Sequence, residues 1–372
     1  MFLPLFVAWA LPAALAAGLP RGALIAGYAP RCDENVTRAV EQGVNVIYWF
    51  AASLLYDNAQ GGAYVSYGGP DLDCIASLSL ALRARGLETA HLLSIGGWDA
   101  PHVETNSSAA ALHAAWRAWN RDVVARPGLE RGFDGVDWDL EGNDDVASPY
   151  NFFTAVVLDA VGEFSVLEQA AGFAVSMVPP ESYLDPTTHA FDQSLLHAYP
   201  DGWQPNFTYH GHNAYAYLLS RYGETAAPGR GRVPTFDVVL IQLYETYSHL
   251  TFNLTQLGQS AADYLEAWVP RVVRGWHVDF GSCGNVSWPS ADVRVPAERL
   301  LVGFGNAWTG GAKNAFVQPA DIGDAHERLR RINMAPRGYF FWSIPSEGDI
   351  PQRAAEPLFF AKGLNDFLRV RR

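Results

Sequence analysis

The segment GFDGVDWDLEGND, residues 132–144, decides how the rest of the sequence is interpreted. Acidic side chains alternate with apolar ones in it, and the acids are Asp137, Asp139 and Glu141. Because side chains alternate across a β-strand, the three acids share one face and the intervening apolar residues share the other. Burying an unpaired charge costs several kcal/mol or more, so acids on an otherwise apolar strand indicate a chemical role.

The spacing of these acids suggests which one carries a proton. Neighbouring acids on one face of a strand have Cα atoms roughly 6.5–7 Å apart, so their charges interact. Repulsion and burial raise the pKa of at least one carboxyl, which keeps a proton available near neutral pH. Glu141 stands at the C-terminal end of the strand, where a substrate could reach it in a barrel, and we predict that it is the proton donor. Asp134 does not lie on the strand face that carries these three acids, and we expect it to order the start of the strand.

Eight short apolar runs, this segment included, alternate with longer helical patterns along the chain, which is typical of βα units around a parallel sheet. We therefore predict a single-domain α/β fold, the (β/α)₈ TIM barrel, with the acids facing inward. The predicted strands are 23–28, 44–50, 90–97, 133–141, 172–178, 236–244, 300–305 and 338–344. The helix candidates are 109–126, 150–161, 211–221, 260–274 and 324–332.

The connections between these elements locate the active face and limit the alternatives. The long segments 179–235 and 245–299 follow strands, so they lie on the face where such barrels keep active sites. A doubly wound open sheet is the alternative fold. It requires a Gly-rich phosphate turn after the first strand, and GYAPRCDEN, residues 27–35, does not supply one.

Composition excludes several classes of partner. The 372 residues are 49% hydrophobic and 17% charged, with a net charge of −13 and no cluster of Lys and Arg interleaved with aromatic residues. Nucleic acid and anionic membranes are therefore poor partners. We expect a monomer.

The first twenty residues, MFLPLFVAWALPAALAAGLP, resemble a secretory signal, and Ala14-Leu15-Ala16 fits its cleavage site. We predict a signal peptide at 1–16, a catalytic barrel at 17–372 and a secreted, extracellular protein, free of the membrane once the signal is removed. An uncleaved anchor is the alternative. N-glycosylation tripeptides, which support export, begin at Asn35, Asn106, Asn206, Asn253 and Asn285.

Three cysteines do not form a dense disulfide framework, so the hydrophobic core must supply most of the stability. We favour a pair between Cys32 and Cys74, which lie in the first two βα units, and a free thiol at Cys283. The alternative is that none of them pairs.

Three alternative roles fit the acidic segment less well than a site inside a barrel. An exposed acidic edge strand does not account for the apolar residues between the acids. A calcium loop of the EF-hand type needs Glu six residues after Gly142, where Ser148 stands, and a helix rather than a strand before it. We therefore predict no metal. Serine-nucleophile catalysis lacks its G-x-S-x-G turn.

Five stretches together resemble the catalytic domain of family 18 glycoside hydrolases, with features of the bacterial and plant class III-like subgroup. They are similar to the family elements D-G-x-D-x-D-x-E, S-x-G-G, M-A-P-E and Q-x-Y-N, followed by a tryptophan on the eighth strand. Two positions depart from these patterns: Pro179 replaces Ala, and Glu245 replaces Asn or Asp. The matching residues are Asp134, Gly135, Asp137, Asp139, Glu141, Ser94, Gly96, Gly97, Glu181, Gln242, Tyr244 and Trp342.

The resemblance implies a barrel enzyme, a chitinase that hydrolyses β-1,4-linked N-acetylglucosamine polymers without metal or organic cofactor. It implies substrate-assisted catalysis, in which Glu141 protonates the glycosidic oxygen and the substrate's acetamido oxygen attacks the anomeric carbon. Asp139 then accepts a hydrogen bond from the acetamido N–H, Tyr244 binds the acetamido carbonyl, and Asp137 shares a proton with Asp139. The anomeric configuration is retained.

The resemblance also implies sugar-binding residues. Trp342 would form the floor beneath the reacting sugar. Tyr28, Trp98 and Trp308 are candidate platforms for neighbouring sugars, although for Trp98 and Trp308 packing in the core is almost equally expected. The remaining candidates for substrate binding are Gln242, Met177 and Glu245. For Ser94, Gly96 and Gly97, packing inside the barrel is the main expectation.

Two other functions use the same residues. An endo-β-N-acetylglucosaminidase acting on N-glycans would share the carboxylates, and a chitin-binding lectin would share the barrel without the catalysis. The segment 306–337 is short for the extra domain that deepens the groove in some family members. We therefore expect an open groove and endo cleavage.

Overall fold

The computed structural model describes residues 18–143, 145, 147–195, 212–227, 231–282, 286–310, 314–352 and 355–369. The predicted signal peptide, the glycosylation candidates Asn206 and Asn285, and the thiol of Cys283 lie outside the described residues.

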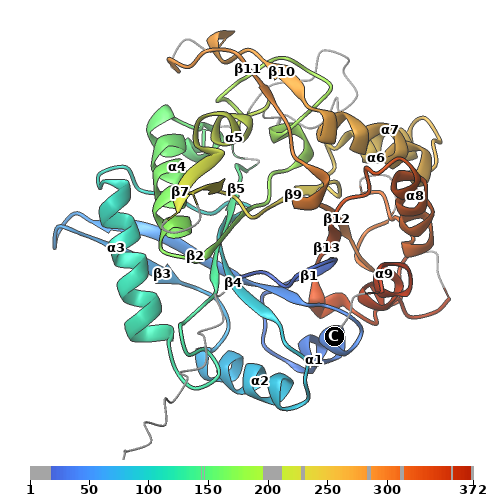
Figure 1. Cartoon of the computed structure of the whole chain (residues 1–372), viewed down its shortest axis with the longest axis horizontal. Helices are drawn as coiled ribbons and strands as arrows, with labels where there is room; N and C mark the ends of the chain where they lie inside the picture. The colour runs from blue at the N-terminus through green and yellow to red at the C-terminus, as the bar shows by residue number, and fades with distance from the viewer. Residues whose placement is uncertain are drawn as a thin grey trace, which may run out of the picture.

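Eight parallel strands close into a barrel, because β1 pairs with both β13 and β2 (Figure 1). In chain order they are β1 (Leu24–Ala29), β2 (Val46–Asp57), β4 (Ala90–Gly97), β5 (Gly135–Leu140), β6 (Ala174–Met177), β9 (Val238–Gln242), β12 (Leu300–Gly305) and β13 (Gly338–Trp342). Each overlaps one of the predicted strands, and β2 extends seven residues beyond its predicted end at residue 50. The (β/α)₈ barrel predicted from the apolar runs is confirmed.

Helices surround the barrel and cover its outer face (Figure 1). They are α1 (Glu34–Glu41), α2 (Leu72–Ala84), α3 (Ala109–Trp119), α4 (Ala155–Ala170), α5 (Ala216–Tyr222), α6 (His249–Thr255), α7 (Ala261–Arg274), α8 (Pro319–Arg331) and α9 (Phe360–Leu368). All five predicted helices exist. The predicted bounds of α4, 150–161, are wrong at both ends. The Thr154 hydroxyl caps the start by accepting from the Val157 N–H at 3.1 Å, and the helix continues to Ala170.

The predicted strands did not include three short hairpins. The outer half of β2 pairs with β3 (Gly62–Tyr67), and this hairpin extends outward past α3 (Figure 1). Within the long segments, β7 (Glu224–Ala227) pairs with β8 (Gly231–Pro234), and β10 (Trp276–Val278) pairs with β11 (Ala291–Val293). β7 packs against α4 on the outside of the barrel. Such short strands carry too few alternating residues to stand out in a sequence.

The two faces of β5 lie in different cores, as the alternation predicts. Trp138 points outward, where its indole N–H donates to the Ser165 hydroxyl of α4 at 2.8 Å and its ring meets the edge of Phe164. The interior cluster contains Tyr28, whose hydroxyl reaches across from β1 to Asp137 on β5 at 2.7 Å. The acids therefore face the lumen. Asp134 accepts from the His91 N–H at 2.8 Å, which joins the start of β5 to β4, as expected.

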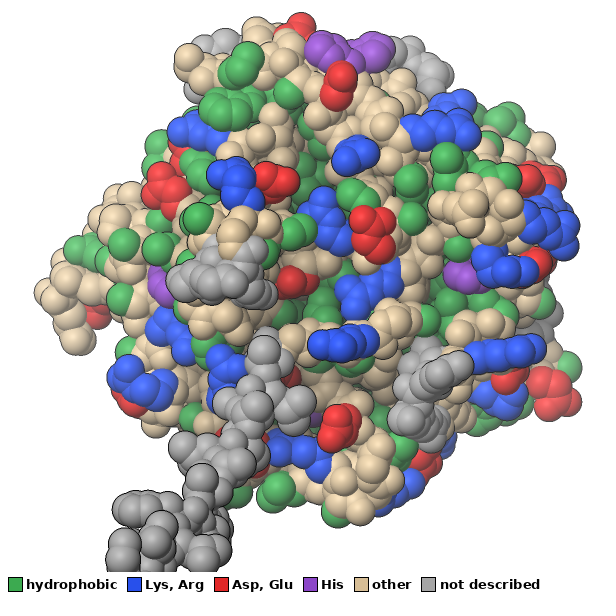
Figure 2. Space-filling view, viewed as in Figure 1, with side chains coloured by type: hydrophobic (Ala, Val, Ile, Leu, Met, Phe, Trp, Pro, Cys, Tyr) green, Lys and Arg blue, Asp and Glu red, His purple; other side chains and the backbone are tan. Residues whose placement is uncertain are grey.

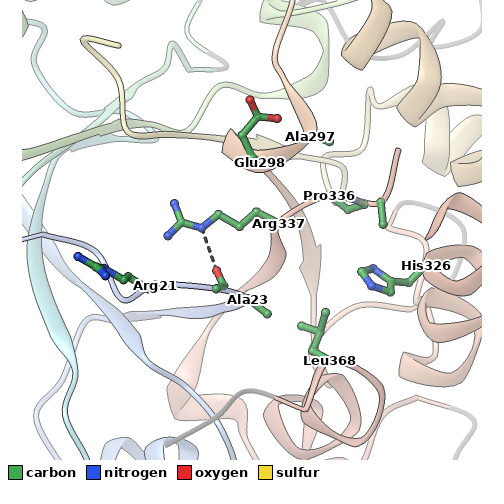
Figure 3. Close-up of a pocket in the computed structure, with 10 residues that line it drawn as sticks. Arg21, Ala23, Ala297, Glu298, His326, Pro336, Arg337 and Leu368 are labelled. Atoms are coloured by element: carbon green, nitrogen blue, oxygen red, sulfur yellow. Dashed lines mark hydrogen bonds between the residues drawn. The ribbon is translucent and has the colours of Figure 1, made fainter. Parts of the chain in front are cut away.

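The segment that precedes β1 covers the end of the barrel at which the strands begin. Leu19 packs against the interior cluster, and the Arg337 guanidinium donates to the carbonyl oxygens of Pro20 at 2.6 Å and Gly22 at 3.0 Å. Beside them lies an open cavity of about 730 Å³, lined by residues that include Glu298 and His326 (Figure 3). The guanidinium contacts the chain itself, so it serves to hold this segment across the end of the barrel.

The predicted disulfide is confirmed, since Cys32, just before α1, is bonded to Cys74 in α2. On the face seen in Figure 2, basic and acidic side chains are interspersed rather than separated by sign. Within the described residues, every helix is too short or too polar to cross a bilayer.

Candidate functional site

Strand β5 places Asp137, Asp139 and Glu141 on the lumen side of the barrel, one above the other towards its C-terminal end. Their exposed fractions are 0%, 5% and 5%, so all three are buried although they are acidic. Buried carboxyls must be hydrogen-bonded or protonated, and the surrounding groups show which applies to each.

Asp137 is the deepest acid and is bound by hydroxyl groups. It accepts from Tyr28 at 2.7 Å, from Ser176 at 2.6 Å and from Ser94 at 3.4 Å. Burial raises the pKa of Asp137 to about 6, and the three hydroxyl donors limit that rise because they favour the charged form. Asp137 is therefore the acid of the row that is best prepared to be an anion. Tyr28 was predicted to bind substrate and Ser94 mainly to pack inside the barrel, and both contact Asp137 here.

Asp139 and Glu141 form a coupled pair. Burial raises the pKa of both carboxyls well above the ordinary values, and the charge of Asp137 adds to the rise at Asp139, as that of Asp139 does at Glu141. The hydrogen bond between them lowers the pKa of Asp139 and raises that of Glu141, which is the effect of a Glu141 O–H donating to the Asp139 carboxylate. These directions favour Glu141 as the carboxyl of the pair that keeps a proton.

One oxygen of the Glu141 carboxyl, the buried Oε2, has no hydrogen-bond partner among the described residues. The other oxygen, Oε1, accepts from the Gln242 amide at 3.3 Å, and the same amide nitrogen donates to Asp139 at 3.1 Å and to the Val178 carbonyl at 2.7 Å. Gln242, predicted to bind substrate, thus contacts the two outer acids directly.

The end of β9 adds Tyr244 and Glu245 to the site. Tyr244 is 8% exposed and belongs to the interior cluster. Burial raises its pKa, and the charges of Glu245, Asp139 and Glu141 raise it further, so its hydroxyl stays neutral. Glu245 is half-buried, and its pKa is raised by burial and by the charge of Glu141. Both residues therefore lie within electrostatic range of the carboxylates.

Aromatic rings surround the acids at the open end of the barrel. The half-buried ring of Trp342, at the end of β13, lies 5.7 Å from Tyr28 and 4.9 Å from Phe50. Trp308 is 40% exposed, lies 6.2 Å from Tyr244 and donates its indole N–H to the Trp342 carbonyl. Trp98, directly after β4, is 41% exposed. Trp98 and Trp308 are therefore not core residues.

Three predicted residues have positions that the motifs did not indicate. Met177 does not line the site: it belongs to the cluster between barrel and helices, and Val178 is the neighbouring residue that faces inward. This correction follows from alternation, since Ser176 already faces Asp137. Tyr28 is only 1% exposed, so its ring is not an open platform for a sugar. Glu181 instead binds α6 and α7, through the Leu250 N–H at 3.3 Å and the Tyr264 hydroxyl.

The two glycines that end β4 allow it to approach β5 closely. Gly96 and Gly97 have φ angles of +107° and +108°. A Cβ on Gly96 would lie 2.3 Å from the Asp139 carbonyl oxygen, and one on Gly97 would lie 2.3 Å from the Phe50 ring. Both positions therefore require glycine for packing inside the barrel, as expected.

The turn after Glu141 is held by residues that the sequence patterns did not reveal. The His102 imidazole lies 2.9 Å from the Glu141 carbonyl oxygen, and the Asp99 N–H donates to the Gly142 carbonyl at 3.1 Å. The Asn143 N–H donates to the Asn151 side chain at 2.7 Å. Burial lowers the pKa of His102 to about 4, so the ring is neutral at physiological pH. Phe50 was also missed, although its phase with Val46 and Tyr48 on the same predicted strand would have placed it inside.

Within the described part of the chain, no three His, Cys, Asp or Glu side chains are grouped so that they could hold a metal ion. The chemistry that these residues offer is a protonated carboxyl with a free oxygen, next to two carboxyls that can carry negative charge and beneath aromatic rings. Such a set suits general acid catalysis on a sugar.

Comparisons with known proteins show the fold. No family model matches the sequence, and no curated protein matches it. Many solved structures do match. Concanavalin B is 12% identical over 93% of this chain and 98% of its own, with a TM-score of 0.53. A class V chitinase from Pseudomonas fluorescens Pf-5 is 12% identical over 93% and 99%, with a TM-score of 0.51.

A chitinase from Chromobacterium violaceum ATCC 12472 is 12% identical over 94% of this chain and 100% of its own, with a TM-score of 0.50. The resemblance to family 18 chitinases that the motifs indicate is thus confirmed at the level of the fold.

Proposed function

We propose that this chain is a chitinase that hydrolyses β-1,4-linked N-acetylglucosamine polymers by substrate-assisted, retaining catalysis. The observation that carries the proposal is the buried Glu141 carboxyl, whose pKa is raised by burial and by the charge of Asp139 and whose Oε2 has no hydrogen-bond partner among the described residues. Barrel folds host many activities, so the function is inferred from the residues of the site and not from the fold.

In the first step, Glu141 transfers its proton to the glycosidic oxygen, and the bond from that oxygen to the anomeric carbon breaks. The acetamido oxygen of the same sugar attacks the anomeric carbon and forms a bicyclic oxazolinium ion. Asp139, once its bond to Glu141 is released, accepts the acetamido N–H and stabilises the positive charge. Asp137, bound by its three hydroxyl groups, keeps a negative charge near this centre.

In the second step, the Glu141 carboxylate takes a proton from water, and the resulting hydroxide equivalent opens the oxazolinium ion at the anomeric carbon. The two displacements retain the configuration, and Glu141 is again protonated. The Tyr244 hydroxyl, kept neutral by burial and by its acidic neighbours, is suited to donate to the acetamido carbonyl. The Trp342 ring offers an apolar surface to the sugar above it.

We infer an open groove and endo cleavage. Trp98 and Trp308 expose 41% and 40% of their surface, as rings that contact a long polymer would. The segment 306–337 contains α8, and its described residues include no sheet of an additional domain. We also propose that the chain is secreted after removal of residues 1–16. The Cys32–Cys74 bond supports this proposal, because disulfides persist in oxidising compartments.

The test is release of a fluorophore from chitobiose and chitotriose conjugates, with a high-mannose glycopeptide assayed in parallel. Glu141→Gln should abolish release while binding of chitin oligomers persists, because the amide keeps the shape but has no proton to give. The matched control is Glu298→Gln, an exposed glutamate at the opposite end of the barrel, which should keep full activity.

Wild-type protein that is inert on every chitin oligomer and on the glycopeptide contradicts the proposal. Cleavage of the glycopeptide alone would assign the chain to endo-β-N-acetylglucosaminidases, and binding without cleavage would make it a lectin.

A further inference from the structure

The ladder between β5 and β6 ends at Trp138, three residues before Glu141. The Val178 N–H donates to the Trp138 carbonyl at 2.9 Å, and in a parallel ladder the next donor would be the N–H of residue 180 to the Leu140 carbonyl. Residue 180 is a proline, which has no N–H. The Val178 carbonyl, which the Leu140 N–H would use, accepts from Gln242 instead. β6 therefore leaves both backbone groups of Leu140 without a strand partner.

A tyrosine hydroxyl satisfies these groups. The Tyr215 hydroxyl accepts from the Leu140 N–H at 2.7 Å and lies 3.1 Å from the Leu140 carbonyl oxygen, to which it can donate. A hydroxyl can accept one hydrogen bond and donate another at the same time, whereas a phenylalanine ring can neither accept nor donate these bonds. Tyr215 comes from the segment just before α5, far along the chain from β5, and it is 1% exposed.

The position of this hydroxyl is fixed by its surroundings. The Tyr215 ring packs against Phe153 at 6.0 Å and against Tyr183 at 6.2 Å, and its backbone N–H donates to the Tyr183 carbonyl at 3.0 Å. Burial, and then the charge of Asp139, raise its pKa well above the ordinary value. The hydroxyl therefore stays neutral and can keep both bonds while the acids titrate.

Leu140 lies between the two outer acids of the site, Asp139 and Glu141. Its backbone connects Asp139 to Glu141, and the turn that follows is already held at the Glu141 and Gly142 carbonyls by His102 and Asp99. Without the Tyr215 hydroxyl, the backbone would be held on both sides of Leu140, but the N–H and carbonyl of Leu140 itself would have no partner. A displacement of about 1 Å at a reacting group can lower a rate by about a hundredfold, so this bond is placed where small shifts matter.

We propose that Tyr215 is a positioning residue for catalysis, whose hydroxyl replaces the missing strand partner of Leu140 and so holds Glu141 at the distance that proton transfer requires. The inference rests on the proposed function for its kinetic part, and its structural part can be tested without any activity.

The test is Tyr215→Phe, with Tyr217→Phe as the matched control. Tyr217 lies two residues further on, is fully buried and donates to Asp159 at 2.8 Å, so the control also removes a buried hydroxyl but does not touch β5. For Tyr215→Phe we expect kcat on chitotriose conjugates to fall about tenfold to a hundredfold while KM changes less than about twofold. The control should retain kcat.

Hydrogen exchange at the Leu140 amide supplies the second measurement. Exchange should be slow in the wild type, clearly faster in Tyr215→Phe and unchanged in the control. An active wild type whose kcat is unaltered by Tyr215→Phe would overturn the proposal, as would fast exchange at Leu140 in the wild type. If the wild type hydrolyses no aminosugar substrate, the proposed function fails, and exchange alone decides whether Tyr215 holds Leu140.

Discussion

Removal of the Tyr28 hydroxyl should make the buried acids harder to ionise. Tyr28→Phe deletes the 2.7 Å donor to Asp137 but keeps the ring, which stacks on Tyr48 at 4.9 Å. A hydrogen bond to a charged acceptor contributes about 1.5–3 kcal/mol, which corresponds to about 1–2 pKa units at about 1.4 kcal/mol per unit. The pKa of Asp137, about 6 in the wild type, should therefore rise by that amount.

This shift should appear in the pH dependence of kcat/KM, which reports the ionisations of the free enzyme. The site needs one anion in the Asp137–Asp139 pair, because the acetamido N–H requires an acceptor. In Tyr28→Phe the raised pKa makes the Asp137–Asp139 pair lose its proton only at higher pH. The acid limb of the profile should therefore move to higher pH by about 1–2 units. The alkaline limb, which reports loss of the proton from Glu141, should move far less.

The assay is hydrolysis of a chitotriose conjugate between about pH 4 and pH 9, with the unfolding temperature measured in parallel. Tyr339→Phe is the control: its hydroxyl lies 3.1 Å from His326 Nδ1, away from Asp137, and its loss should leave the profile unchanged. An acid limb that stays at the wild-type pH in a stably folded Tyr28→Phe variant would refute the reasoning.

Three further predictions concern packing and stability. Gly96→Ala places a Cβ 2.3 Å from the Asp139 carbonyl at a φ of +107°, so it should lower the free energy of unfolding by about 1–3 kcal/mol and reduce kcat; wild-type values in urea unfolding and hydrolysis would count against it. The pKa of Glu181 is raised by burial from 4.5 to about 7, so its stabilising contribution is present below pH 4.5 and is lost as the pH rises through 7. Glu181→Gln should remove about 3 kcal/mol of that pH dependence, and equal slopes of unfolding free energy against pH in the two proteins would contradict this. Cys74→Ser opens a loop with a sequence separation of 42 and should cost about 4 kcal/mol in chemical unfolding under oxidising conditions, whereas an unchanged midpoint would show that the bond does not stabilise the fold.

The barrel and its acidic row could be predicted because their signals are local. Each barrel strand is a short apolar run, and the period of two along residues 133–141 is enough to place Asp137, Asp139 and Glu141 on one face. The same rule, applied to residues 44–50 and 172–178, would have selected Phe50 and Val178 in place of Met177. These two errors came from relying on a motif where strand phase gave the answer.

The residues that hold the backbone around Glu141 could not be predicted, because they are distant from it in sequence. Tyr215 lies 75 positions from Leu140, and His102 lies 39 positions from Glu141. The segment that carries Tyr215 has no periodicity that fixes its path, so only the folded chain shows where its hydroxyl lies. Pro180 is the one local hint, since a proline after a strand predicts that its ladder ends there.

The central claim is that Glu141 gives its proton to a glycosidic oxygen while the substrate's own acetamido group attacks the anomeric carbon. The most direct measurement is the anomeric configuration of the product, followed by NMR in the first minutes of hydrolysis of a chitin oligomer, before mutarotation. We expect the new reducing end to appear as the β-anomer. Initial release of the α-anomer would mean direct attack by water and would contradict the mechanism.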